Sequence, residues 1–272
     1  MKQKIFSTIK GNIHYWINEK KEKEITLVFL PGLTADHRLF IKQVKYFKKN
    51  FHILIWDAPG HGKSRPFELS FSIMDKACWL HEILYKEGIE KVILIGQSMG
   101  GYVGQAFAEQ YPDALVGFIS IDSAPLLRKY ITSAELWLLK RMEPVYKIFP
   151  WKILLKSGIK GTSFSEYGRK LIYKIWLDYE KKDFCRLASY GYNILAEAIE
   201  ANLKYEIKCP ALLICGEKDQ AGSVKRYNRK WTKQTGIPLV WIPKAGHNSN
   251  VDNPDIVNLE IENFVKNILE TI

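Results

Sequence analysis

The stretch VILIGQSMGGYVGQAFAEQYP runs from Val92 to Pro112 and carries the strongest structural signal in the chain. Its first residues are apolar and branched, as in a buried strand, and its second half has the pattern of an amphipathic helix. Ser98 stands between the two halves, with Gly96 and Gly100 each two residues away. Glycine lacks a Cβ atom and therefore fits a crowded turn from strand to helix. The pattern predicts a serine hydroxyl that projects from the end of a strand, beside the N–H groups of a helix N-terminus.

Short apolar runs rich in branched residues recur along the chain, and near-continuous runs of this kind are typical of parallel strands buried on both faces. They lie at 25–30, 51–56, 91–96, 115–121, 210–216 and 237–243. Helix-like patterns lie between or after them, at 36–49, 72–88, 98–112, 223–236 and 254–272. This alternation predicts an α/β fold with a mostly parallel central sheet flanked by helices. Residues 4–18 differ and predict an antiparallel hairpin at one sheet edge, turning around Lys10-Gly11-Asn12.

The alternation stops between about Ala124 and Tyr205, where the chain is helical in pattern and dense in aromatic residues. We expect a core made of 1–123 and 206–272, with 124–205 inserted between two strands as a helical cap. Most aromatic side chains of the insertion are expected to pack between its helices, and some to line a pocket over the serine. The candidates include Trp137, Trp151, Trp176 and Tyr190.

Two loops supply the groups that a serine needs to act as a nucleophile. A neutral hydroxyl attacks poorly unless a base takes its proton, and a carboxylate must orient that base. Asp219 follows the strand-like run 210–216, and His247 follows the run 237–243. Together with Ser98, these residues are expected at the carboxyl ends of parallel strands, where open α/β sheets bind ligands.

These motifs make the chain resemble the α/β-hydrolase superfamily over nearly its whole length. GQSMGG is similar to the family's nucleophile elbow, WDAPGHGKS to its D-x-P-G-x-G-x-S loop, and GEKD and AGHN to its acid and base loops. LPGLTADHRLF looks like the loop whose backbone completes the oxyanion hole. The order Ser98, Asp219, His247 is also the order described for these enzymes.

The resemblance implies an α/β-hydrolase fold and a role for each site residue. Ser98 is expected to attack as the nucleophile, His247 to act as the base, and Asp219 to orient that base. The backbone N–H groups of Leu33 and Met99 are expected to form the oxyanion hole.

The assignment of the acid has an alternative. In some relatives the acid follows an earlier strand, which makes Asp122 a second candidate. Asp122 is followed by Ser-Ala-Pro at the entrance to the insertion, where a carboxylate can cap or anchor the chain. Asp219 lies one strand-loop unit before His247, so the sequence favours Asp219.

We therefore expect a serine hydrolase that cleaves an ester, thioester, lactone or activated C–C bond through an acyl-enzyme. The aromatic insertion indicates a small to medium, partly apolar substrate. The serine disfavours the haloalkane dehalogenase and epoxide hydrolase branches, which resemble this fold but use Asp at that position. Three alternatives stay open: a ligand-binding protein that keeps the triad, a lyase, and a cofactor-free haloperoxidase with the same residues.

No cofactor, metal or nucleic acid is expected. The loop DAPGHGKS approaches the phosphate-binding P-loop motif, but Asp57 stands where that motif needs glycine, and Pro66 interrupts the helix that should follow. His61 lies in this loop, where a turn is expected, and the other histidines show no paired spacing of metal ligands. The net charge of +11 comes from lysines spread along the chain, which is typical of a solvated surface rather than of one basic face.

The chain shows no targeting or membrane-spanning pattern. No apolar run approaches the roughly 18 residues of a membrane span, and the first residues lack the long apolar core of a signal peptide. The four cysteines show no CxxC spacing, and a reduced compartment is the default for such a chain. We expect a cytoplasmic protein without a membrane span that acts on a small molecule. No motif indicates its oligomeric state.

Overall fold

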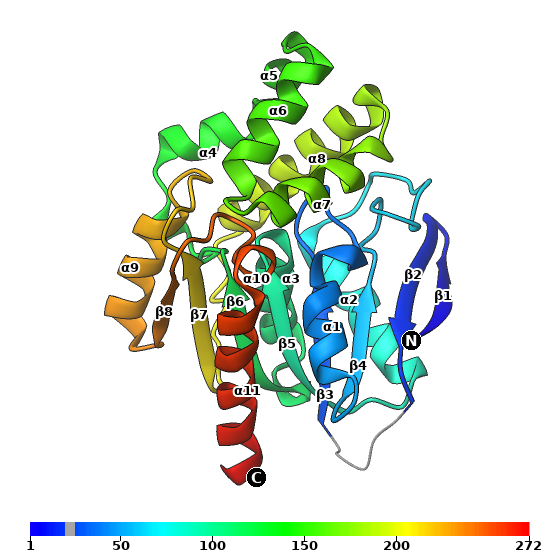
Figure 1. The fold of residues 1–272 in the computed structure, drawn as a ribbon, viewed down its shortest axis with the longest axis vertical. Helices are drawn as coiled ribbons and strands as arrows, with labels where there is room; N and C mark the ends of the chain where they lie inside the picture. Colours follow the sequence, from blue (N-terminus) through cyan, green and yellow to red (C-terminus); the bar gives the residue numbers. More distant parts are fainter. Residues whose placement is uncertain (20–24, 272) are drawn as a thin grey trace.

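The computed structural model describes residues 1–19 and 25–271, and within them the chain forms an eight-stranded sheet (Figure 1). The strand order is β1-β2-β4-β3-β5-β6-β7-β8. An antiparallel hairpin is formed by β1 (Lys2–Thr8) and β2 (Gly11–Ile17). Strand β2 also pairs antiparallel with β4. The others are parallel to one another: β3 (Ile25–Leu30), β4 (His52–Trp56), β5 (Lys91–Gln97), β6 (Leu115–Ile121), β7 (Ala211–Gly216) and β8 (Leu239–Ile242).

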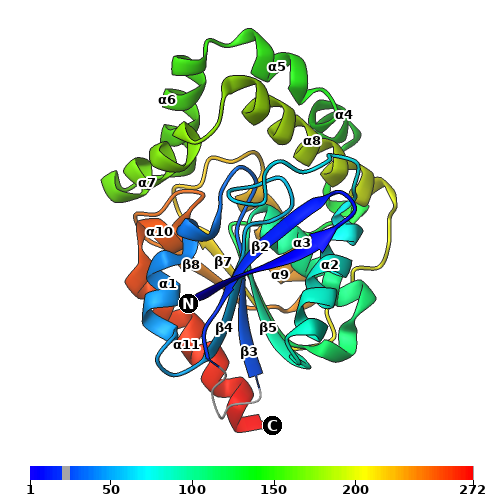
Figure 2. The ribbon, with the colours of Figure 1, turned by 90° about the vertical axis from the view of Figure 1, so that its right-hand side faces the viewer.

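The parallel strands are apolar throughout because alternate side chains enter two separate cores. On β5, Val92 and Leu94 face one core, whereas Ile93 and Ile95 face the other. Helices α2, α3 and α9 cover the first face, and α1 and α11 cover the second (Figure 2). Their bounds are α1 (Ile41–Phe47), α2 (Ile73–Lys86), α3 (Met99–Gln110), α9 (Val224–Thr235) and α11 (Pro254–Thr271).

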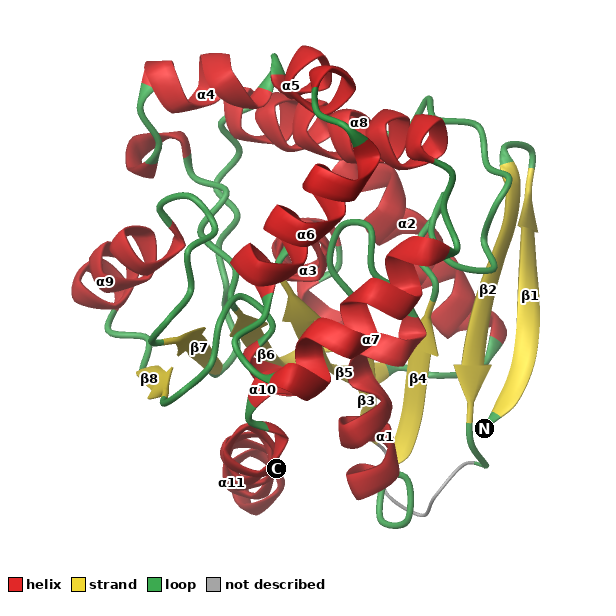
Figure 3. Ribbon diagram, turned by 45° about the horizontal axis from the view of Figure 1, so that its top comes forward, coloured by secondary structure: helices red, strands yellow, loops and turns green. Residues whose placement is uncertain are grey.

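A run of helices connects β6 to β7 and lies across the carboxyl ends of the parallel strands (Figures 1 and 3). It consists of α4 (Ser133–Leu139), α5 (Met142–Ile148), α6 (Trp151–Thr162), α7 (Glu166–Leu177) and α8 (Lys181–Glu200). Polar side chains start two of these helices, since Thr132 accepts from Glu135 N and Ser165 accepts from Gly168 N. The described residues also form short helices before α4, at η3 (Arg128–Tyr130), and outside this connection, at η1 (His37–Phe40), η2 (Pro112–Ala114) and α10 (Ser249–Asp252).

The predicted α/β fold with a mostly parallel sheet is confirmed, and each predicted parallel strand begins and ends within two residues of the observed one. The edge hairpin is also present, but it turns at Ile9 and Lys10, because Gly11 already pairs with Thr8 as the first residue of β2. The helix predicted over 36–49 is divided into η1 and α1. Among the described residues, no helix combines the length and apolarity needed to cross a bilayer.

Candidate active site

Ser98 occupies the tight turn between β5 and α3. Its backbone φ is 49°, a left-handed value that is costly for a residue with a Cβ atom. Two hydrogen bonds hold the turn: Ser98 N donates to Ile121 O at 2.8 Å, and Ser123 Oγ donates to Ser98 O at 2.8 Å. The strained turn lifts the serine side chain out of the sheet.

The two glycines of the motif are required because main chains approach closely at this turn. A Cβ atom on Gly96 would lie 2.4 Å from the carbonyl carbon of Gly100. A Cβ atom on Gly100 would lie 1.9 Å from Leu30 O, at the end of β3. Helix α3 therefore packs directly on the backbone of β3 and β5, as the sequence pattern predicts.

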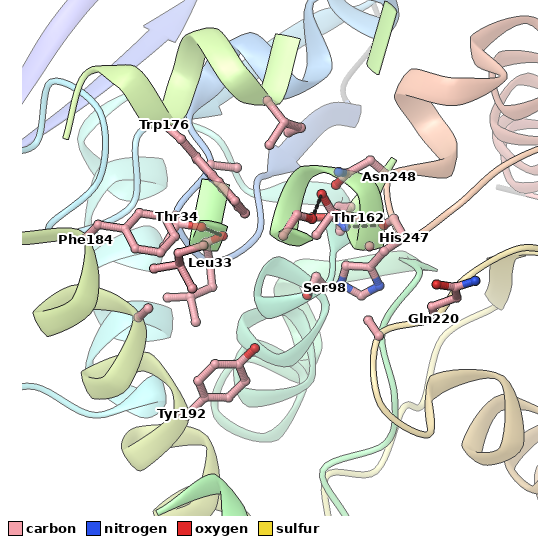
Figure 4. A pocket seen from close by; sticks show the side chains of 18 of the residues that line it. Leu33, Thr34, Ser98, Thr162, Trp176, Phe184, Tyr192, Gln220, His247 and Asn248 are labelled. Atoms are coloured by element: carbon pink, nitrogen blue, oxygen red, sulfur yellow. Dashed lines mark hydrogen bonds between the residues drawn. The ribbon is translucent and has the colours of Figure 1, made fainter. Parts of the chain in front are cut away.

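The structure brings Ser98, Asp219 and His247 together in one line of hydrogen bonds. His247 Nε2 lies 2.9 Å from Ser98 Oγ, and His247 Nδ1 lies 3.0 Å from Asp219 Oδ2. Asp219 is held in turn by Ala221 N, which donates to its Oδ1 at 2.7 Å. Gln97 Nε2 donates to His247 O at 2.7 Å and fixes the histidine loop to the end of β5. Figure 4 shows the Ser98 and His247 side chains facing each other.

The electrostatic surroundings favour a basic imidazole. Burial, the largest single effect, lowers the pKa of His247, but the charge and hydrogen bond of Asp219 and the charge of Asp122 together outweigh it, so that the net pKa is raised above 6.5. The Asp219 side chain is only 1% exposed, so solvent does little to weaken its attraction for the imidazole. A histidine in this setting is well placed to accept a proton from Ser98.

Asp122, the second candidate for the acid, makes different contacts. Its Oδ1 accepts from Gly216 N at 2.7 Å and its Oδ2 accepts from Ser249 N at 2.8 Å, so it joins the end of β7 to α10. Its carboxyl lies close to that of Asp219. Burial, and then the charge of Asp219, raise the pKa of Asp122 well above its usual range. Asp219 is therefore the carboxylate in contact with His247 Nδ1, whereas Asp122 anchors the main chain at two points.

The predicted oxyanion donors lie on two segments beside Ser98. Met99 is the first residue of α3, and the first N–H groups of a helix have no acceptor within the helix. Leu33 follows β3 in a turn that Ala35 N closes by donating to Gly32 O at 3.2 Å. Leu33 and Ser98 line the same cavity, and Met99 follows Ser98 directly in the chain.

The cavity above Ser98 has a volume of about 280 Å³. It lies near the small end of the range for ligand pockets, which is about 300 to 1,000 Å³. The sheet loops contribute Leu33, Thr34, Ala35, Gln97, Ser98, Gln220, Ala221, His247 and Asn248. The overlying helices contribute Tyr146, Leu154, Gly158, Gly161, Thr162, Ile172, Trp176, Phe184, Ala188 and Tyr192. Among these described residues, His247 is the one whose side chain ionises near neutral pH.

The residues singled out in the insertion have different positions. Trp176 lines the cavity, on the same side as Phe184 (Figure 4). Trp137 is 57% exposed on α4, and Trp151 packs against Phe184 with ring centroids 5.1 Å apart. Tyr190 Oη donates to the main-chain oxygen of Phe71 at 2.5 Å. Of the four aromatic residues named from the sequence, Trp176 lines the cavity. Tyr146, Phe184 and Tyr192 also line it, although the sequence offered no reason to prefer them.

Two residues of the 57–64 loop also have defined roles. His61 is buried, and its Nδ1 lies 2.9 Å from Pro59 O, within the expected turn and outside the cavity lining. Asp57 is fully buried and accepts from His37 N at 2.8 Å and from Lys63 N at 2.7 Å. The loop thus braces the segment after β3 through hydrogen bonds.

Asp36, His37 and Asp57 have the composition of a metal site, but hydrogen bonds and an ion pair already occupy them. His37 Nδ1 lies 2.8 Å from Asp57 Oδ1. Asp36 pairs with Arg38 Nη2 at 2.6 Å. We therefore assign this cluster a structural role beneath the loop that carries Leu33.

Asp252 is a site-supporting residue that the sequence did not reveal. Its Oδ1 accepts from Ser165 N at 2.9 Å and from Ser165 Oγ at 2.7 Å. Its Oδ2 accepts from Phe164 N at 2.7 Å and from Gly246 N at 2.8 Å. One carboxylate therefore ties the junction of α6 and α7 to the loop that carries His247.

Comparison with known proteins finds hydrolases whose sequences are similar to this one over most of the chain. Residues 25–254 match the model of the alpha/beta hydrolase fold family. (E)-2-((N-methylformamido)methylene)succinate hydrolase from Acinetobacter baylyi is 24% identical over 262 residues, covering 93% of this chain and 94% of the relative. Serine hydrolase BPHL from Mus musculus is 24% identical over 273 residues, covering 94% of this chain and 84% of the relative.

A solved structure shows the same fold. It is that of a thermophilic esterase from Thermogutta terrifontis with malate bound, and its TM-score is 0.76 at 21% identity. The match covers 98% of this chain and 99% of that one. The expectation of an α/β-fold hydrolase is thereby confirmed at the level of the family. The chain belongs to the alpha/beta hydrolase fold family.

Proposed function

We propose that this protein is a serine hydrolase with Ser98 as nucleophile, His247 as base and Asp219 as the acid that orients it. The observation that best supports this proposal is a chain of two hydrogen bonds at the cavity. Asp219 Oδ2 lies 3.0 Å from His247 Nδ1, and His247 Nε2 lies 2.9 Å from Ser98 Oγ. This arrangement has the nucleophile, the base and the orienting carboxylate in hydrogen-bond reach of each other.

The reaction follows from the positions of these groups. His247 Nδ1–H donates to Asp219, which leaves Nε2 free to take the proton of Ser98 Oγ as the oxygen attacks a carbonyl. The N–H groups of Leu33 and Met99 stabilise the negative oxygen of the tetrahedral intermediate. His247 then gives its proton to the leaving group, and water attacks the resulting acyl-enzyme by the same route.

Helices α4–α8 act in this proposal as the cap, which corresponds to the insertion 124–205 over a core of 1–123 and 206–272. Their inner side chains are largely apolar or aromatic and confine the cavity to about 280 Å³. A small space of this kind favours a short, partly apolar acyl group.

The cavity also discriminates by charge. Its described lining includes no lysine, arginine, aspartate or glutamate side chain. A carboxylate on the substrate would therefore be desolvated without a cationic partner. The Acinetobacter baylyi relative is named for a succinate derivative, which carries carboxylate groups. We propose that this chain instead prefers an uncharged ester, thioester or lactone.

Labelling and turnover test the proposal together. A fluorophosphonate probe should modify Ser98 alone, as seen by mass spectrometry of the digested protein. The same preparation should hydrolyse nitrophenyl acetate and butyrate over many turnovers, and a hemisuccinate ester much more slowly. Labelling without repeated turnover would instead indicate a ligand-binding protein, and a preference for the hemisuccinate would contradict the neutral pocket.

A further inference from the structure

The helices that line the cavity carry a different kind of surface on their outer side. Seventeen large hydrophobic side chains are exposed in the described chain, and ten of them lie between Trp137 and Leu177. Single exposed apolar residues are ordinary on protein surfaces, whereas a concentration of them marks a binding surface. We use the name outer cap surface for the exposed side chains of α4–α7 and their connections.

The most exposed of these residues, Ile148, lies with two others where α5 meets α6. Ile148 is 78% exposed, Phe149 is 46% exposed and Ile153 is 52% exposed. Helix α5 and the start of α6 lie at the end of the molecule that is farthest from the C-terminus (Figures 1 and 2). The apolar side chains therefore project from one extremity of the protein.

The same surface is strongly basic. Helices α4–α7 with their connections, residues 133–177, contain nine lysines and arginines but only three acids, Glu135, Glu143 and Glu166, so they carry +6 of the net charge of +11. All three acids are already in ion pairs, Glu135 with Arg226 at 2.5 Å, and Glu143 with Lys147 and Glu166 with Lys170, each at 2.6 Å. The lysines of α6, at 152, 156 and 160, take part in none of these pairs.

A groove between α6 and α7 combines the two features. It has a volume of about 620 Å³ and runs over the apolar side chains of Leu155 and Ile159. Its rim holds Lys152, Lys156 and Lys160, which recur at four-residue spacing and so share one face of α6. The groove thus presents cationic groups beside an apolar floor.

We propose that the outer cap surface docks the protein on an anionic phospholipid bilayer, with α5 and α6 in contact with the lipid. Interfacial helices combine lysines and arginines with Trp, Phe and Leu, because the cations meet lipid phosphates while the apolar groups enter the acyl boundary. The three rim lysines and the Ile148–Ile153 turn supply both parts.

Other occupants fit the surface less well. Protein interfaces are depleted in lysine, which is the main cation here. Nucleic acids are bound through phosphate contacts and stacked aromatic groups, and exposed aliphatic residues such as Ile148 and Ile153 contribute to neither. Docking in this orientation would also bring Tyr146 and Leu154, on the inner side of the same helices, close to the source of a membrane-dissolved substrate.

Vesicle sedimentation tests this directly. The full chain should sediment with vesicles of phosphatidylcholine containing one third phosphatidylglycerol, and much less with phosphatidylcholine alone. Replacing the rim lysines together, by Lys152→Glu, Lys156→Glu and Lys160→Glu, should weaken partitioning by about a hundredfold or more. The double variant Ile148→Ser and Ile153→Ser should weaken it by on the order of tenfold.

Matched variants elsewhere separate local docking from general attraction. Lys45, Lys48 and Lys49 are exposed at the end of α1, and Tyr85 and Leu259 are exposed on α2 and α11. Charge reversal of these lysines, or Tyr85→Ser with Leu259→Ser, should leave partitioning within about twofold of the parent protein. Circular dichroism and hydrolysis of a water-soluble ester confirm that each variant is folded.

Several results would overturn the proposal. These are no binding to anionic vesicles, equal losses in the control and test variants, or a dimer in sedimentation velocity that the Ile148 and Ile153 changes dissolve. Binding to duplex DNA in preference to vesicles would overturn it as well. Because sedimentation measures location and not catalysis, its failure leaves the proposed hydrolase activity untouched.

Discussion

Asp219 and His247 lie on loops that leave neighbouring strands, whereas Tyr146 and Trp176 reach the same cavity from helices inserted far from both in sequence. Main-chain hydrogen bonds fix the loops, as when Lys218 N donates to Ala245 O at 2.9 Å. Side-chain packing between helices fixes the positions of Tyr146 and Trp176. In the proposed function this difference separates two properties: the sheet loops would supply the groups that cleave a bond, and the cap helices would select the substrate.

The largest effect should come from the nucleophile. Ser98→Ala removes the attacking oxygen, and losing a triad member typically lowers kcat by on the order of 10⁴ to 10⁶. The loss should be the same for every ester, and circular dichroism should stay unchanged. Steady-state kinetics on two esters of different chain length check this. Near-normal activity, or a loss that depends on chain length, would break the division between loops and cap.

The two buried aspartates provide a sharper test within the loops. Asp219→Asn should hold the wrong tautomer of His247 and lower kcat by on the order of 10⁴. Asp122→Asn should instead leave one buried N–H without its acceptor and cost about 1 to 3 kcal/mol of stability. Its kcat should change far less. Kinetics and urea unfolding of both variants decide, and the reverse outcome would make Asp122 the acid.

The pH dependence should follow His247. Because only the neutral imidazole accepts the serine proton, kcat should fall by about tenfold for each pH unit below the pKa of the base. The raised pKa of His247 puts the midpoint above 6.5. Buffers of constant ionic strength from acid to neutral pH check this, and a flat profile contradicts it.

Stability should change with pH in the opposite direction to activity. A folded-state pKa above the unfolded value means that protonation of His247 favours the folded state. That contribution is complete below the unfolded pKa and is lost as the pH rises through the folded pKa. Urea unfolding of the parent protein and of His247→Gln across this range isolates the effect of this one group.

The smallest effect should come from the cap, where two neighbouring leucines form a matched pair. Leu154 lines the cavity, whereas Leu155 lies under the outer groove. Leu154→Ala should enlarge the cavity and raise kcat/KM for longer acyl esters relative to shorter ones by about tenfold. Leu155→Ala should lower stability without altering that ratio. An equal shift in both variants would show that the two faces of α6 do not act separately.

The sequence predicted the sheet and its loops well because the signals there are local. Branched apolar runs marked the parallel strands to within two residues. Ser98 follows β5 directly, and Asp219 and His247 lie in the loops that leave β7 and β8. The strained turn at Ser98 was also readable, since Gly96 and Gly100 are needed wherever main chains approach so closely.

The interior of the cap was not predictable in the same way. Tyr146, Trp176 and Tyr192 line the cavity, while Trp137 is exposed, although all belong to similar helical patterns. Which side of a helix meets the cavity depends on how the helices pack, and the residues of one helix alone do not fix that. The supporting role of Asp252 could not be predicted from the sequence, because its partner Ser165 lies 87 residues away along the chain.

The Asp252 carboxylate also fastens the α6–α7 junction to the loop that carries His247. It binds Phe164, Ser165 and Gly246 at once, and Asn248 N donates to Thr162 O at 3.0 Å beside it. We therefore expect the α6–α7 junction to stay with the histidine loop when substrate enters. In hydrogen-exchange measurements we expect the amides of Phe164, Ser165 and Gly246 to exchange late and together, and those of α5 to exchange early.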